Sequence, residues 1–381
     1  MSSIALCMIV KNEAHVIRRC LESALPLLDY ALIVDTGSTD HTRQAIREFL
    51  NDRRLAGEVL EENWRDFAYN RSFALQKLRE RQDIDYALMI DADEILVFTE
   101  DFDSGLFKQN LNCDIYDIET CYAGISYLRP QLFRNKLPFC FKGVLHEYLD
   151  IQQTCSRETV TAFYNHPLQD SARSHNPTKF LDDAQVLENA IAAETDPFLI
   201  SRYAFYLAQS YRDGGKPEQA LKAYSHRSEL GYWNEEVFIS LLNAGRLKEQ
   251  LAYPEAEVIQ TYLAAYEVMP ARLESLHDAI RFCRLRNKFQ QAYLLANHAL
   301  NVQTPSQGLF LEPWIYDYGL LDEFSIVAYW AGHYQESLQA CLKLLNQTAT
   351  PPSQRPRIRA NAAYAIDKIG KPELNQLLPP G

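Results

Sequence analysis

The sequence contains no CxxC pair and no apolar run long enough to cross a bilayer. The eight cysteines stand apart, several of them inside apolar runs, which argues against a zinc site and favours reduced, buried thiols. No segment reaches about 18 uninterrupted apolar residues, and no charged region followed by a long apolar stretch opens the chain. We therefore expect no transmembrane segment, no signal peptide and a cytoplasmic setting.

An excess of basic residues is also missing. The chain has 38 Lys and Arg against 50 Asp and Glu, which gives a formal net charge of -12. Nucleic acids and anionic membranes reward basic surfaces, so neither is expected as a main partner. The 381 residues, 47% of them hydrophobic, are enough for about two globular domains.

Strand-like and helix-like segments alternate in the first half of the chain. Apolar runs predict buried strands, and amphipathic segments between them predict helices. This alternation indicates right-handed βαβ units and a mostly parallel, Rossmann-like sheet. The predicted strands cover 4–10, 30–34, 58–61 and 86–90, and the predicted helices cover 15–25, 41–50 and 67–81, with Asp40 capping the second helix.

The pattern changes twice further along. From Asp114, strands are predicted at 114–121, 125–134, 141–149 and 159–164, which indicates a mixed or antiparallel extension of the sheet. From about Pro177 nearly every segment reads as helical. Small residues recur at helix contacts around 203–224, 280–299 and 328–341, and Gly214-Gly215 supplies a turn, which is typical of helix-turn-helix repeats of 34 residues. We expect an α/β domain at 1–175 and an all-α repeat domain at 176–381.

Acidic residues follow two of the predicted strands. Asp35 ends the second strand, and Asp91 and Asp93 follow the fourth, which we take to be its neighbour in the sheet. Ligands of parallel sheets bind at the carboxyl ends of strands, so we expect these three side chains to share one crevice around one cation. Carboxylates two residues apart suit Mn²⁺ or Mg²⁺ bridged to a diphosphate. The alternatives are a solvated acidic turn at 91–94 and an ordinary helix start at 35–40.

Five segments in this order resemble the motifs of family 2 glycosyltransferases. They are MIVKNE at 8–13, VDTGSTD at 34–40, Trp64 with Phe67, Asn70 and Arg71, DADE at 91–94, and GVLHE at 143–147. The later His166, DSARS at 170–174, FYLAQSY at 205–211 and Trp233 are similar to the subgroup with a tetratricopeptide-like C-terminal domain. The resemblance implies a GT-A fold, a nucleotide-sugar donor such as a UDP-sugar, and inversion at the anomeric carbon.

The resemblance also implies roles for individual residues. Asp93 would bind Mn²⁺ or Mg²⁺, and His166 is a second candidate metal ligand, although a structural histidine is an equal alternative. Arg71 would contact the diphosphate, with a solvated surface residue as the alternative. The residues expected to bind the donor are Val10, Asn12, Glu13, Asp35, Gly37, Asp40, Asn70, Arg71, Asp91 and Ala92.

Inverting transfer needs a base that takes a proton from the acceptor. The downstream acid pair that supplies this base in many relatives has no clear match, so we choose Glu147 first and Asp150 second, with His146 orienting the base or contacting phosphate. A solvated strand edge is the alternative for His146 and Glu147. Arg129 and Arg134 are expected to flank the acceptor cleft.

The acceptor is expected to be a glycan, a lipid-linked sugar or a protein. A rival hypothesis is an inactive nucleotide-binding scaffold whose helical repeats bind a protein partner. A nucleotidyltransferase is less favoured, because the residues after the first strand, Lys11-Asn12-Glu13, lack the glycines of a phosphate-binding loop.

Overall fold

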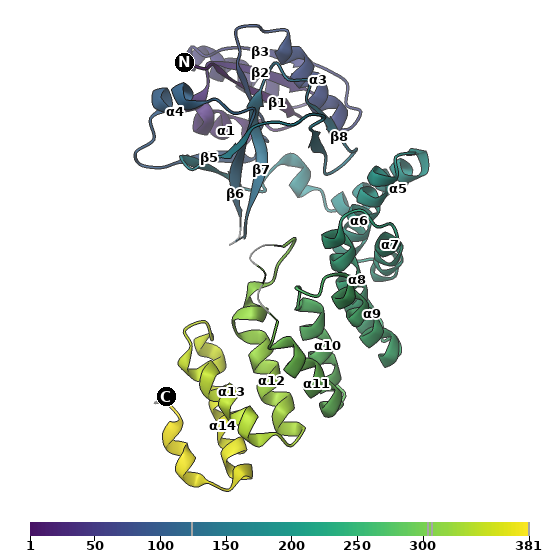
Figure 1. Ribbon diagram of the computed structural model, residues 1–381. Coiled ribbons are helices and arrows are strands. Elements are labelled where there is room, and N and C mark those ends of the chain that lie inside the picture. The colour runs from purple at the N-terminus through teal and green to yellow at the C-terminus, as the bar shows by residue number, and fades with distance from the viewer. Residues whose placement is uncertain (123–124, 303–304, 306–307, 380–381) are drawn as a thin grey trace. The chain divides into compact units, whose positions relative to one another are not determined.

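The protein is described here by a computed structural model that covers residues 1–122, 125–302, 305 and 308–379 (Figure 1). The chain separates into two compact units, Met1–Ala190 and Ile191–Gly381, hereafter unit 1 and unit 2. The division falls within helix α5 (Lys179–Ala193). The domain boundary predicted between residues 175 and 176 stays a prediction.

Unit 1 is built on a mixed sheet with strand order β3-β2-β1-β4-β7-β6-β11-β5, and β10 pairs with β6. Strands β3, β2, β1 and β4 run parallel, whereas β7 runs antiparallel to both β4 and β6. The predicted parallel sheet with a mixed extension is therefore confirmed. The strands are β1 (Ile4–Val10), β2 (Tyr30–Asp35), β3 (Ala56–Glu61), β4 (Tyr86–Leu88), β5 (Glu94–Phe98), β6 (Ile115–Tyr122), β7 (Ile125–Arg134), β10 (Arg157–Thr159) and β11 (Phe163–Pro167).

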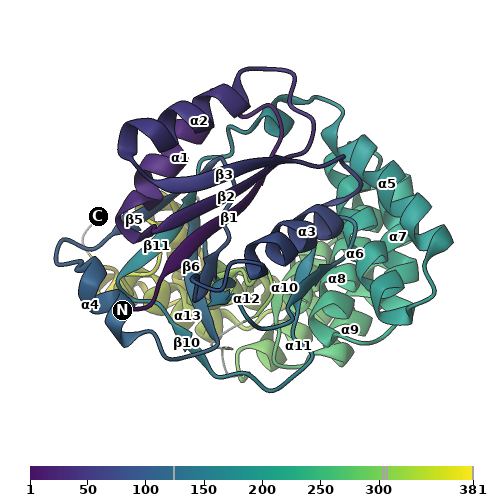
Figure 2. The ribbon, with the colours of Figure 1, turned by 90° about the horizontal axis from the view of Figure 1, so that it is seen from above.

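Helices cover both faces of the parallel part of the sheet (Figure 2). Alternate residues of β1 point to opposite faces, as strand geometry requires. Leu6 and Met8 pack against α1 (Ile17–Ala24) and α2 (Thr42–Arg53). Cys7 packs on the other face against α3 (Phe67–Arg79). Because β1 is buried on both sides, it reads in the sequence as an unbroken apolar run.

Two of the predicted strands were wrong, and so was the prediction that the second and fourth predicted strands are neighbours in the sheet. Residues 141–149 form a hairpin of β8 (Cys140–Lys142) and β9 (Tyr148–Asp150), because Gly143 (φ 103°) and His146 (φ 52°) leave the extended conformation between them. Residues 159–164 contain only the end of β10 and the start of β11. Strand β1 lies between β2 and β4, so the loops that carry Asp35 and Asp91 do not follow neighbouring strands.

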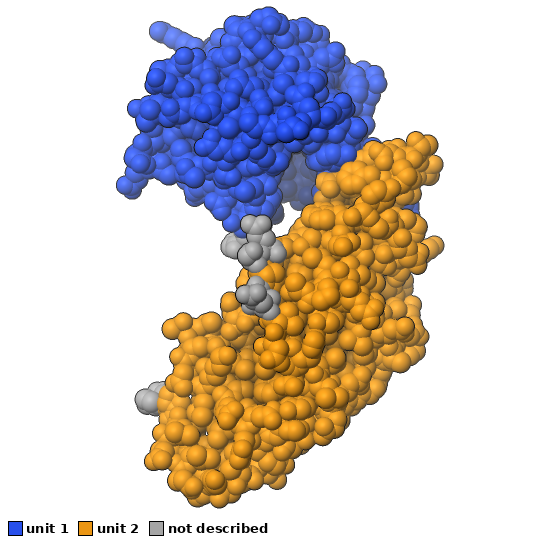
Figure 3. Space-filling view, viewed as in Figure 1, with its two compact units in different colours: residues 1–190 blue, residues 191–381 orange. Residues whose placement is uncertain are grey.

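Unit 2, coloured orange in Figure 3, is a succession of helices in which each packs on the next. The three predicted pairs correspond to α6 with α7, α10 with α11, and α12 with α13. The pair α8 with α9 was not predicted; there Gly245 allows the ring of Tyr262 to approach. The helices are α6 (Pro197–Asp213), α7 (Pro217–Glu229), α8 (Asn234–Gln250), α9 (Glu255–Val268), α10 (Glu274–Leu285), α11 (Phe289–Ala299), α12 (Leu320–Trp330), α13 (Tyr334–Asn346) and α14 (Arg355–Ile369).

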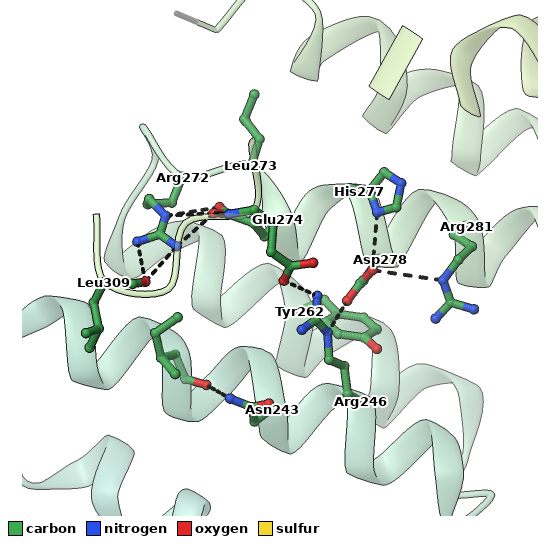
Figure 4. A network of polar contacts seen from close by, with 12 residues as sticks. Asn243, Arg246, Tyr262, Arg272, Leu273, Glu274, His277, Asp278, Arg281 and Leu309 are labelled. Atoms are coloured by element: carbon green, nitrogen blue, oxygen red, sulfur yellow. Dashed lines mark hydrogen bonds and ion pairs between the residues drawn. The ribbon is translucent and has the colours of Figure 1, made fainter. Parts of the chain in front are cut away.

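Ion pairs and hydrogen bonds connect side chains in the middle of unit 2 (Figure 4). The guanidinium of Arg272, which is 1% exposed, binds the carboxylate of Glu274 at 2.7 Å and the carbonyl oxygen of Leu309 at 3.1 Å. Arg246 of α8 binds Asp278 of α10 at 2.6 Å. With these helices, the predicted order of an α/β fold followed by an all-α repeat is confirmed.

Candidate active site

The loops that follow β1 and β2 are tied together at the carboxyl edge of the sheet. The side-chain oxygen of Asn12 accepts a hydrogen bond from the Thr39 N–H at 2.8 Å, and the Asn12 N–H donates to the Ser38 hydroxyl at 2.8 Å. Asn12 adopts a left-handed conformation (φ 59°), which asparagine tolerates better than most residues. These contacts make one rigid rim out of the segments 8–13 and 34–40.

Asp35, at the end of β2, is 1% exposed, and only one of its two carboxylate oxygens accepts hydrogen bonds. Its Oδ1 accepts hydrogen bonds from the N–H groups of Gly37 at 3.1 Å and Ser38 at 2.9 Å. Its Oδ2 is buried without a hydrogen-bond partner. Gly37 provides the turn, since its φ of 104° is unfavourable for other residues. A buried carboxylate oxygen without a donor is costly, so Asp35 is a candidate ligand-binding group.

Asp40 and Glu13 connect the same loops to the start of α2. Asp40 accepts hydrogen bonds from the Thr42 N–H at 3.0 Å and the Ala14 N–H at 3.2 Å. Burial by itself raises the pKa of Asp40, but the hydrogen bond from the Thr42 hydroxyl, together with these two, outweighs it and holds that pKa below its ordinary value. The Thr42 hydroxyl also accepts a hydrogen bond from the Glu13 N–H at 2.7 Å. Asp40 therefore binds Thr42, the first residue of α2, but it precedes the N-cap residue His41 and is not the capping residue that was predicted.

Charges of alternating sign run across the edge beyond β4. Arg71 of α3 binds the Asp91 carboxylate at 2.6 Å and forms an ion pair with Glu147 at 2.6 Å. Arg129 of β7 lies 4.0 Å from the other oxygen of Asp91 and 2.5 Å from Glu94. Burial raises the pKa of Asp91, but the two guanidinium groups outweigh it and lower that pKa. Asp91 therefore stays ionised, and the five side chains, hereafter the charge chain, carry a net charge of -1.

Asp93 lies in a different electrostatic environment from Asp91. Burial, and then the charge of Asp91, raise the pKa of Asp93, while hydrogen bonds from Ser171 oppose the rise. The backbone carbonyl of Asp93 accepts the Leu168 N–H at 3.0 Å. A cation near both carboxylates would relieve their repulsion.

Residues 168–173, hereafter the strap, lie over the loops at this edge. Asp170 binds the Arg19 guanidinium through two hydrogen bonds of 2.8 and 2.9 Å. The Ala172 N–H donates to both oxygens of Glu13 at 3.3 Å. Burial, the largest effect, raises the pKa of Glu13 to about 7, although the hydrogen bond from Ala172 lowers it. The DSARS segment at 170–174 thus contacts Glu13, in the loop after β1, and Asp93, in the loop after β4.

The candidate bases occupy different positions. Glu147 follows β8 in the hairpin loop and is half-buried beside Arg71. Asp150 lies at the end of β9, paired with Lys142 at 2.9 Å and accepting from Gln152 at 3.0 Å. The Gln152 and Lys142 contacts lower the pKa of Asp150. His146 is exposed and left-handed. Glu147 is therefore the base candidate that joins the charge chain.

The remaining predicted residues divide between the rim and its support. Asn70 is fully buried, and its amide group bonds to the backbone of Asn63 at 3.1 Å and of Arg65 at 3.0 Å, so it shapes the chain before α3. Val10 and Ala92 are buried at the edge. The Nδ1 of His166 lies 2.8 Å from the carbonyl oxygen of Cys121, within the sheet.

The expected meeting of three carboxylates is not observed. Within the ranges that the structure describes, no group of three or more His, Cys, Asp or Glu side chains is arranged to hold a metal ion. Because β1 separates β2 from β4, the loops that carry Asp35 and Asp91 start roughly 10 Å apart, two strand spacings. Asp35 and Asp91 therefore do not follow adjacent strands, as was expected.

Sequence reasoning gave no role to Glu94 and Ser171, although both lie in quoted motifs. Arg129 was expected only to flank an acceptor cleft. The signal available was the third acidic letter in DADE, Glu94, whose partner Arg129 comes from a strand 35 residues later. In the described part of the chain no helix is both long and apolar enough to cross a membrane.

The fold and the site define a class for the N-terminal part of the chain. Residues 5–100 match the family model described as Glycosyl transferase family 2. The resemblance drawn from the motifs is therefore confirmed for residues 5–100.

Individual proteins resemble the chain over more limited stretches. A TPR repeat-containing protein of Synechococcus elongatus is 31% identical over 155 residues, and the match covers 39% of this chain and 36% of that protein's length. A tetratricopeptide repeat protein from Parabacteroides merdae covers 52% of this chain and 70% of its own, with 18% identity and a TM-score of 0.37. S. aureus TarS 1-349, solved in complex with UDP-GlcNAc, covers 81% and 99%, with 14% identity and a TM-score of 0.36. TM-scores of this size establish neither a shared fold nor a shared function.

Proposed function

We propose that the protein is a metal-dependent, inverting glycosyltransferase that uses a nucleotide-sugar, with a UDP-sugar as the first candidate. The observation that carries this proposal is the pairing of Arg71 with both Asp91 and Glu147, at 2.6 Å each. One guanidinium thereby brings the candidate base next to the turn that would bind the diphosphate. These carboxylates lie 56 positions apart in the sequence and come from different elements.

The nucleoside end of the donor is assigned to the rim around Asp35. Its unpartnered Oδ2 needs a donor, and a base N–H or a ribose hydroxyl is such a group. The rim is held by the contacts of Asn12 and Asp40, so it would need little reorganisation on binding. Pre-formed binding groups lower the cost of association.

The diphosphate end is assigned to Asp91 and Asp93. Mn²⁺ and Mg²⁺ are commonly held by one or two carboxylates together with substrate phosphates, so these two residues fit such an ion without a third protein ligand. The raised pKa of Asp93 fits as well, because burial and the charge of Asp91 both oppose its ionisation until positive charge is nearby. When bound, the ion supplies positive charge to the departing diphosphate.

Glu147 is assigned the role of base. Its carboxylate would accept the proton of the acceptor nucleophile as that atom forms a bond to the anomeric carbon. The bond from that carbon to the diphosphate oxygen breaks on the opposite face, which inverts the configuration. The ion pair with Arg71 would orient Glu147 before the acceptor arrives. The acceptor is a glycan, a lipid-linked sugar or a protein, and unit 2 offers helical repeats for a protein partner.

The test uses the full chain, UDP and Mn²⁺. We expect UDP with Mn²⁺ to raise the melting temperature, and Asp93→Asn to abolish this effect, whereas Asp101→Asn, at an exposed acid of the same unit, should leave it unchanged. A screen of nucleotide-sugars for nucleotide release then identifies the donor. With that donor, Glu147→Gln should lower turnover while retaining the response to UDP and Mn²⁺.

Two results would refute the proposal. Absence of any response of the wild-type protein to UDP with Mn²⁺ would refute the proposed donor site. Unchanged turnover in Glu147→Gln would remove Glu147 from the role of base and leave the donor site standing.

A further inference from the structure

Glu94 is a buried acid whose contacts all go to the turn at 91–93 or to its supports. It is 3% exposed at the start of β5. Its Oε2 accepts a hydrogen bond from the Asp91 N–H at 2.9 Å, and its Oε1 pairs with Arg129 at 2.5 Å. A carboxylate that accepts a backbone N–H forms a stronger bond than a neutral acceptor does. Glu94 therefore fixes the backbone on which Asp91 and Asp93 stand.

Arg129 lies near two acidic side chains, those of Glu94 and Asp91. It lies 2.5 Å from Glu94 but 4.0 Å from Asp91, so its main partner is Glu94. Its side chain is 31% exposed, which leaves room to move. Without Glu94, the guanidinium would shift toward Asp91, which already binds Arg71 at 2.6 Å. Glu94 thus keeps a second cation from neutralising Asp91.

Two buried side-chain amides of the sheet, those of Gln131 and Asn165, connect to Glu94. Gln131 of β7 lies 3.4 Å from Glu94 Oε2 and also donates to the carbonyl of Met89, and Asn165 of β11 donates to Gln131 at 3.2 Å. Gln131 is 2% exposed and Asn165 is fully buried. These contacts connect Glu94 on β5 to side chains of β7 and β11.

We propose that Glu94 is a positioning residue that holds the turn at 91–93 in its binding geometry and, by binding Arg129, keeps the Asp91 carboxylate available to a cation and diphosphate. This proposal rests on the proposed function for its ligand, but the geometry of the turn can be measured in the free protein. Neither residue touches the reacting atoms. Their effect is exerted through Asp91 and the backbone of Asp93.

The test compares Glu94→Ala with Glu94→Gln/Arg129→Met. The alanine variant loses the acceptor for the Asp91 N–H and frees Arg129. The double variant keeps an acceptor of the same shape and removes the charge that would otherwise be left alone. Glu119→Gln, at an exposed site on β6, is the matched control.

The first measurement is amide hydrogen exchange in the free protein. We expect the Asp91 amide to exchange roughly tenfold faster in Glu94→Ala, because it loses a bond to a charged acceptor. The amides of β4 and the melting temperature of the double variant should stay near wild type. Unchanged exchange at Asp91 in Glu94→Ala would overturn the proposal.

The second measurement is the affinity for Mn²⁺ in the presence of UDP. Glu94→Ala should weaken it by roughly 10- to 100-fold, the usual effect of losing a group that orients a metal ligand. The double variant should recover most of the affinity, which a general loss of stability would not predict. Failure of the double variant to recover, while it remains folded, would overturn the proposal. If the wild type binds no UDP with Mn²⁺, the proposed function fails, and hydrogen exchange alone decides whether Glu94 positions the turn.

Discussion

Replacement of Glu13 by glutamine should change how the stability of unit 1 depends on pH. Burial raises the pKa of Glu13 from its ordinary 4.5 to about 7. The folded protein therefore binds this proton more tightly than the unfolded chain does. The stabilisation is fully present below about pH 4.5 and is lost as the pH rises through 7. A rise of this size is worth about 3 kcal/mol, since one pKa unit is about 1.4 kcal/mol.

The glutamine side chain stays neutral at every pH and still offers an oxygen to the Ala172 N–H. We expect Glu13→Gln to match wild type near pH 4.5 and to exceed it by about 2–3 kcal/mol near pH 8. Urea unfolding from pH 4.5 to 8 measures this difference. Trp64 is the tryptophan of unit 1, so its fluorescence reports on this unit once Trp233, Trp314 and Trp330 are changed to phenylalanine.

The same three changes are made in the reference protein, so they cancel in the comparison. A constant difference between the two proteins across this pH range would show that Glu13 titrates alike in the folded and unfolded states. The reasoning from burial would then be wrong.

Three further predictions concern other parts of the molecule. Arg272→Met should destabilise unit 2 by about 3–5 kcal/mol in urea unfolding, because it leaves Glu274 buried without its partner; adding Glu274→Gln should recover part of this loss, and no recovery would contradict the explanation. Gly245→Ala should cost about 1–3 kcal/mol, because the new Cβ would lie 2.5 Å from the Tyr262 ring, and adding Tyr262→Leu should reduce the cost in the same assay. Asp170→Asn should change the free energy of unfolding by less than about 1 kcal/mol, since the ion pair of Asp170 with Arg19 is exposed. Amide hydrogen exchange of the strap should nevertheless become faster. An unchanged exchange rate would show that this ion pair does not hold the strap.

The charge chain explains why two carboxylates of one turn have opposite pKa shifts. Asp91 faces Arg71 and Arg129, and their charges lower its pKa. Asp93 is buried beside Asp91 without such a partner, so its pKa is raised. Groups whose environments move their pKa values apart are typical of functional sites. The turn therefore combines one fixed anion with one carboxylate that a cation would stabilise.

Local patterns in the sequence were sufficient for the elements of the fold. The buried run at β1 and the amphipathic segment at α3 predict their structures because each depends on neighbours in the chain. The same holds for the turn at Gly214-Gly215, where Gly215 has a φ of 70°. The hairpin of β8 and β9 was missed, because the left-handed conformation of His146 leaves no periodic signal.

The sequence by itself determined which residue types stand after which strands, and hence predicted an edge of the sheet with acidic loops. Only the tertiary structure decided how those residues are grouped. Strand order places β1 between Asp35 and Asp91, whereas α3 and the hairpin bring Arg71 and Glu147 to Asp91. Such pairings depend on the packing of elements distant in the chain, and electrostatic energies depend on the resulting distances and burial, which a linear pattern of residues does not contain.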